Sequence, residues 1–189
     1  HRQGLTGQQP SDACPARRAA QTLNSAPMPT TPSSPIGSAQ VELITGRVSI
    51  IVASRDARLR PHLMRAVGCR LSHDWRRVTV LLPEGGGREV LEDLRDNHQI
   101  AVVFSRPSSN QTVQLKGNDA TVTPSGPEDK ALAETYLQGF IEEIGQLGHS
   151  ADVAHTILGH DGALTSVHFT VAAAFEQTPQ IFMIALRQR

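Results

Sequence analysis

The chain has 189 residues, 39% of them hydrophobic, which suits one globular domain of ordinary size plus an extension. Its 18 basic and 18 acidic residues cancel, and this excludes a global field that would attract nucleic acid or an anionic membrane. Any charged ligand must therefore be held by a local cluster of side chains.

Signals for membrane insertion, secretion and disulfide bonding are missing. No run approaches 18 consecutive apolar residues, and the first residues lack the apolar core of a secretory signal. The two cysteines, Cys14 and Cys69, form no spaced framework, which fits a reducing compartment. We therefore expect a cytoplasmic protein with no membrane partner.

Residues 1–40 differ in composition from the rest of the chain. They hold half of its twelve prolines among Ser, Thr, Ala and Gln, and they show neither strand nor helix periodicity. Such a segment cannot bury enough apolar surface to offset its chain entropy. We predict a disordered Pro/Ser/Ala-rich tail over 1–40.

Regular patterns begin after the tail with three predicted strands. The β-branched run at 46–56 reads as a buried strand, 61–70 alternates as a second strand, and 77–83 makes a third that ends at Pro83. We expect these three strands to be antiparallel neighbours.

The remaining elements alternate between helix and strand. Helical spacing over 85–97 predicts a short helix, and the strand-like run 99–105 should form a hairpin with the alternating stretch 112–124. A long helix is expected from 127 to 147, a shorter one over 150–158, and a last strand over 163–175. Six strands with flanking helices predict an α+β fold, an antiparallel β-barrel.

Metal and nucleophile motifs are missing from the sequence. No His-x-x-x-His pair is backed by a carboxylate, no Cys-x-x-Cys occurs, and no Gly-x-Ser-x-Gly elbow is present. Aromatic residues make up only 4% of the chain, so stacking platforms for nucleic acid are scarce. We expect no metal site and no nucleic-acid partner.

Three polar features could instead hold an anionic ligand. The glycine run before Arg88 leaves backbone N–H groups free at a helix start, although a plain flexible loop is an alternative reading. Arg65 lies in an otherwise apolar strand and needs an anionic partner, either a carboxylate of the chain or a ligand phosphate. Gln114 and Lys116 share the polar face of one strand, which is either solvated or suited to the edge of a heterocycle.

Six segments follow one another over roughly residues 46–123: "GRVSIIVASRD", "RPHLMRAV", "RVTVLLP", "VLEDLRDN", "IAVVF" and "QLKG". Together they resemble the pyridoxamine 5'-phosphate oxidase-like family. The order and spacing of these segments carry the resemblance. It implies a split β-barrel that binds FMN at a homodimer interface. With the six strands and flanking helices predicted above, we expect a six-stranded antiparallel split β-barrel domain over 41–175 and a C-terminal tail over 176–189.

Residue by residue, the resemblance assigns roles to six positions. It implies Arg65 and Arg88 for the phosphate, Leu82 and Gly87 for backbone contacts, and Gln114 with Lys116 for the flavin ring or ribityl chain. The activity implied is that of a flavin-dependent oxidoreductase that uses a small-molecule substrate or electron donor. A deazaflavin, a haem or a non-catalytic flavin carrier are the alternatives, and no residue identifies the substrate.

Overall fold

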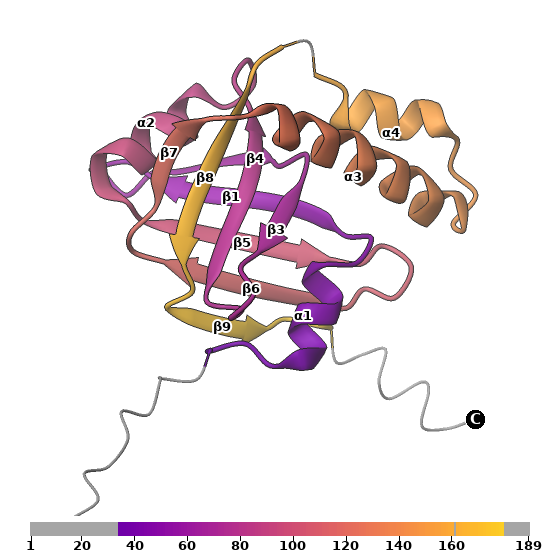
Figure 1. Cartoon of the computed structure of the whole chain (residues 1–189), viewed down its shortest axis with the longest axis horizontal. Coiled ribbons are helices and arrows are strands. Elements are labelled where there is room, and N and C mark those ends of the chain that lie inside the picture. The colour runs from indigo at the N-terminus through magenta and orange to yellow at the C-terminus, as the bar shows by residue number, and fades with distance from the viewer. Residues whose placement is uncertain (1–33, 161, 180–189) are drawn as a thin grey trace, which may run out of the picture. The chain divides into compact units, whose positions relative to one another are not determined.

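The computed structural model describes residues 34–160 and 162–179, which form two antiparallel sheets and four helices (Figure 1). Sheet A has the strand order β2-β1-β5-β6-β9 and sheet B the order β3-β4-β8-β7. The strands of sheet A are β1 (Ser49–Arg55), β2 (Pro61–Arg65), β5 (Ile100–Ser105), β6 (Thr112–Gly117) and β9 (Ala173–Glu176). Those of sheet B are β3 (Cys69–Leu71), β4 (Arg77–Pro83), β7 (Thr121–Pro124) and β8 (Leu164–Thr170).

The main core lies between the two sheets. Alternate residues of β1, β5 and β6 point inward, among them Ile50, Phe104 and Leu115, and meet Leu82 and Phe169 of sheet B. In Figure 1 the strands of sheet B cross those of sheet A at a steep angle. Helix α2 (Arg88–Asn97) adds Val90, Leu91 and Leu94 to the same core.

A second, smaller core lies on the other side of sheet B. Helices α3 (Pro127–Gly145) and α4 (Ala151–Leu158) pack side by side there (Figure 1). Phe140 and Ile144 of α3 and Leu158 of α4 cover Leu81 of β4. Because Leu81 and Leu82 point to opposite faces, β4 is apolar on both sides and is buried on both. The α+β prediction is confirmed.

Two predicted strands are each divided between the sheets. The predicted strand 61–70 contains β2 and β3, because the Ala66 N–H donates to Ile50 of sheet A and the next N–H, of Val67, donates to Leu81 of sheet B. The predicted strand 163–175 divides in the same way, since the Val171 N–H donates to Arg76 and the Ala172 N–H to Lys116. These corners join the sheets into a split barrel.

The stretch 112–124 also divides, into β6 of sheet A and β7 of sheet B. The hairpin between 99–105 and 112–117 is confirmed, with Val103 opposite Gln114. The described residues thus contain nine strands rather than the six predicted, because alternation continues through a corner and cannot show where a strand changes sheets.

The boundaries of the predicted tails are corrected within the described residues. Ile36 is buried and helix α1 covers Ser38–Ile44, so folded structure begins before residue 41. At the other end, the Thr178 hydroxyl accepts a hydrogen bond from the Thr112 N–H, so contact with the sheet continues past Glu176. Residues 1–33 and 180–189 lie outside the described part. No helix in the described part is long and apolar enough to cross a membrane.

Candidate functional site

The outer face of sheet A, the side turned away from sheet B, gathers several of the predicted site residues. We define it by the outward residues of its five strands, which are Ser49, Ile51, Ala53, Arg55, Pro61, Leu63, Arg65, Ala101, Val103, Ser105, Thr112, Gln114, Lys116, Ala173 and Phe175. Most of these side chains are half-buried, whereas Leu63 is 64% and Phe175 is 44% exposed. The face therefore carries apolar and polar side chains in nearly equal numbers.

Arg65 and Gln114 lie on one transverse row of this face. Arg65 is opposite Ile51, Ile51 is opposite Val103, and Val103 is opposite Gln114. Three strand spacings separate the two polar residues, which corresponds to about 14 Å. The Gln114 amide has no side-chain hydrogen bond to any residue that the structure describes.

Lys116 lies on the adjacent row, opposite Ala101. Its Nζ is 5.0 Å from the centroid of the Phe175 ring, a cation–π contact. Three of the six predicted site residues, Arg65, Gln114 and Lys116, therefore share one face of one sheet.

The Arg65 guanidinium has no carboxylate within ion-pair distance among the described residues. Its Nη1 donates to the Ser49 hydroxyl at 2.6 Å, across the sheet from β2 to β1. A half-buried cation paired only with a neutral hydroxyl is under-compensated. Of the two partners considered from the sequence, an internal carboxylate is thus not found, and an external anion fits.

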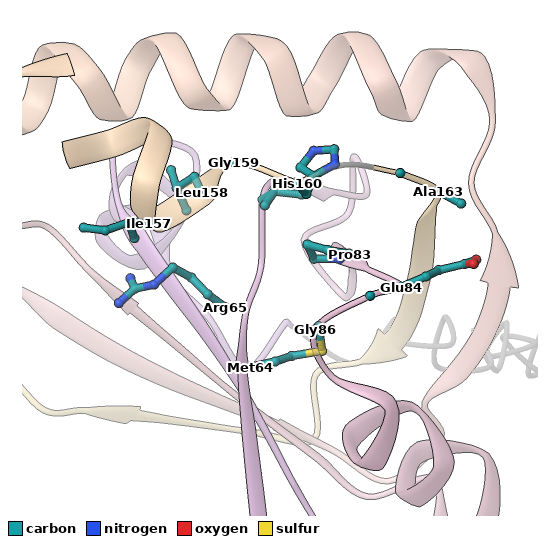
Figure 2. A pocket seen from close by; sticks show the side chains of 13 residues that line it. Met64, Arg65, Pro83, Glu84, Gly86, Ile157, Leu158, Gly159, His160 and Ala163 are labelled. Atoms are coloured by element: carbon teal, nitrogen blue, oxygen red, sulfur yellow. The ribbon is translucent and has the colours of Figure 1, made fainter. Parts of the chain in front are cut away.

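A cavity of about 560 Å³ adjoins Arg65 (Figure 2). Its wall includes Met64 and Arg65 of β2, Gly85 and Gly86 before helix α2, and Ile157 at the end of α4. Figure 2 shows the Arg65 side chain extending toward the side of Ile157, whereas the Glu84 side chain turns away. The arginine and part of the predicted glycine entry thus meet at one cavity.

The other three predicted residues do not join this cavity or the outer face. The Arg88 side chain is 86% exposed, and its Nε donates to Glu92 Oε1 at 2.7 Å, a hydrogen bond that raises the pKa of Arg88. Leu82 points into the core between the sheets. Gly87 begins α2 against Met64, whose Sδ lies only 2.2 Å from where a β-carbon would be, so packing explains this glycine.

Sequence reasoning missed two parts of the site. Ser49 is one, because its contact with Arg65 depends on the pairing register of β1 and β2, which no local pattern gives. The cavity wall contributed by Ile157 and His160 is the other, since the position of α4 follows from tertiary packing. The apolar runs of β1 and β5 were a usable signal for the outer face, because they are apolar on both sides.

Two polar clusters lie elsewhere. Asp93 Oδ2 accepts from the Ser54 hydroxyl at 2.6 Å and is 2.7 Å from His62 Nδ1, so the serine is bonded to the carboxylate rather than to the imidazole. Asp129 binds Arg70 and Ser166 under the start of α3. Within the described residues, no group of three His, Cys, Asp or Glu side chains could hold a metal ion.

Comparison of the sequence with protein-family models and with curated proteins gives no match. Solved structures do match. An F420 reductase has a TM-score of 0.50 at 10% identity, and the match covers 75% of this chain and 100% of that chain. HupZ of group A Streptococcus has a TM-score of 0.46 at 17% identity, over 76% of this chain and 94% of that chain. A Clostridium acetobutylicum protein of the pyridoxinephosphate oxidase family, related to general stress protein 26, has a TM-score of 0.44 at 15% identity, over 74% and 86%.

At these identities the comparisons establish the fold alone. The chain therefore has a split β-barrel fold, which it shares with this F420 reductase.

Proposed function

We propose that the chain binds FMN against the outer face of sheet A, between two copies of itself, and acts as a flavin-dependent oxidoreductase. The observation that carries the proposal is the Arg65 guanidinium, which adjoins a cavity and has no carboxylate partner in the described part of the chain. Arg65 would hold the phosphate, and the nearby Gly85 and Gly86 leave room for close approach, since a β-carbon at either would meet open space.

The residues between Arg65 and the far edge of the sheet fit a planar ring system. Ile51 and Val103 form an apolar floor along the row, and the Gln114 amide beyond them, which no described residue hydrogen-bonds, can both donate and accept a hydrogen bond. Bound FMN would supply hydride or electron transfer. The chain would bind the phosphate, orient the ring and exclude water from it.

A haem is an alternative ligand that the titration must also include. Haem iron is held by an axial His, Cys, Met or Tyr; the outer face as described has none of these residues, whereas the cavity wall beside Arg65 includes Met64 and His160. A deazaflavin offers the same combination of phosphate and ring as FMN, and one matched structure is named as an F420 reductase. The deazaflavin is therefore the second ligand to test.

A second copy of the chain is the proposed cover for the face. Ile51 and Val103 are only half-buried, and Leu63 is 64% exposed, although the strands that carry them read as apolar on both sides. Light scattering with size-exclusion chromatography should give a dimer for the wild type and a monomer for Leu63→Glu, because the charge would be buried in the interface. A monomeric wild type would overturn the dimer.

Ligand titration tests the flavin proposal directly. The purified protein should carry or bind FMN, and Arg65→Gln should weaken this affinity about 10- to 100-fold, the usual range for a lost charged hydrogen bond. Arg88→Gln is the matched control and should bind as the wild type does, because its guanidinium faces solvent. Absence of FMN binding would refute the proposal, and tight binding of F420 alone would replace FMN with the deazaflavin. FMN that no reductant can reduce on the protein would indicate a carrier.

A further inference from the structure

We infer that Ser49 is part of the anion site, as the residue that positions Arg65 and as a second hydrogen-bond donor to the same phosphate. The inference rests on the proposed function and adds a residue that the sequence did not single out. It comes from one contact, the 2.6 Å hydrogen bond from Arg65 Nη1 to Ser49 Oγ.

The contact fixes an otherwise long and mobile side chain. Arg65 is opposite Ile51 in the β1–β2 ladder, so its guanidinium must run along the sheet to reach Ser49, two residues before Ile51 in β1. An arginine loses considerable side-chain entropy when it is ordered. The Ser49 hydroxyl therefore orders the guanidinium before a ligand binds, which lowers the cost of binding.

The same contact leaves hydrogen-bond donors free on both partners. A guanidinium has five N–H groups, and in the described structure Ser49 is the acceptor for Nη1, with no acceptor for the others. A serine hydroxyl that accepts a hydrogen bond still has its own proton to donate, and Ser49 Oγ has no described acceptor. Arg65 and Ser49 together can thus surround a phosphate oxygen from two strands.

A directly comparable serine lies beside this pair. Ser105 of β5 is opposite Ser49 and on the same face, but its hydroxyl is hydrogen-bonded to the Thr112 hydroxyl at 2.8 Å. None of the described hydrogen bonds joins Ser105 to Arg65. Ser105→Ala therefore matches Ser49→Ala in chemistry, strand position and half-buried exposure.

The experiment compares FMN with riboflavin, which lacks only the phosphate, by fluorescence titration. Wild type should prefer FMN, and Ser49→Ala should weaken FMN binding about 10-fold or more while riboflavin affinity stays within twofold. Ser49→Thr keeps the hydroxyl and should restore most of the affinity, and Ser105→Ala should behave as wild type. Equal melting temperatures of the ligand-free variants exclude a general loss of folding.

The other outcomes separate the inference from the proposed function. If wild type prefers FMN and Ser49→Ala binds FMN equally well, the role of Ser49 is wrong and flavin binding stands. If wild type binds both flavins equally, no phosphate site exists at Arg65, and the inference fails while flavin binding again stands. If wild type binds neither flavin, both are refuted. Equal losses for FMN and riboflavin in Ser49→Ala would also overturn the phosphate role.

Discussion

Gly117, the last residue of β6, should tolerate no side chain. A β-carbon there would lie 2.6 Å from Phe169 Cδ2 and 3.0 Å from the Thr170 carbonyl oxygen, well inside the 3.5–4.0 Å at which carbon atoms make favourable contact (about 0.1–0.2 kcal/mol each). Phe169 is fully buried, and the Thr170 N–H donates to Asp119 at 2.8 Å, so neither neighbour can move freely.

We therefore expect Gly117→Ala to lower the free energy of unfolding by about 1–3 kcal/mol, the usual cost of overpacking. For a domain of this size each kcal/mol lowers the melting temperature by about 2–4 °C. Urea denaturation followed by circular dichroism measures the loss. Lys116→Arg, one residue earlier on the opposite and exposed face, keeps a cation beside the Phe175 ring; it is the control and should change stability by less than about 0.5 kcal/mol.

A double variant tests the assigned cause. Phe169→Leu removes the ring atom nearest to the added methyl group, so Gly117→Ala with Phe169→Leu should be less destabilised than the sum of the two single variants by at least about 0.5 kcal/mol. Strict additivity, or a Gly117→Ala variant as stable as wild type, would refute the account that close approach of the two sheets requires this glycine.

Three further predictions concern side chains outside the outer face. Burial alone would raise the pKa of Asp129, but hydrogen bonds from the Gly126 N–H and Ser166 and the charge of Arg70 lower this pKa below its usual value. The ionised carboxylate therefore stabilises the fold above about pH 4, and this stabilisation is lost as the pH falls through the lowered pKa. In urea denaturation the wild type should lose stability below that pH more steeply than Asp129→Asn. Burial raises the pKa of the Cys69 thiol to about 12, so in a Cys14→Ser variant a thiol reagent at pH 8 should react with Cys69 far more slowly in the native protein than after unfolding. Arg88→Ala should leave the ligand-free melting temperature nearly unchanged, because its pair with Glu92 is exposed.

The sequence predicted which side chains share a face of a strand better than it predicted where the chain passes from one sheet to the other. Alternation placed Gln114 and Lys116 together on one face of β6, as observed. It could not reveal the corner after Ala66, because the side chains keep alternating while the backbone changes its partner from Ile50 to Leu81. The partner change is a tertiary event with no local signal.

Whether a contact of a site residue could be predicted from the sequence depends on how far apart the two partners lie along the chain. The solvent-facing pair of Arg88 with Glu92 was foreseeable, since residues four apart on a helix are neighbours and carry opposite charges. The pair of Arg65 with Ser49 was not, because those residues are 16 positions apart and meet only through the register of two strands. An internal carboxylate for Arg65 remained open from the sequence, and its exclusion within the described part required coordinates.

Strands β1 and β4 are both apolar on both faces, but the described residues bury the two faces of these strands to different extents. In β4 both faces are buried within the chain, Leu82 by the core between the sheets and Leu81 by α3 and α4. In β1 the inward Ile50 and Val52 are fully buried, whereas the outward Ile51 and Ala53 are only half-buried. The same sequence pattern is thus satisfied inside the fold in one strand and only partly in the other. The described residues therefore bury β4 on both faces but leave the outward face of β1, which lies beside Arg65 and Gln114, only partly covered. The second copy of the chain that we propose would complete this burial, and Arg65 and Gln114 would give it polar groups to contact.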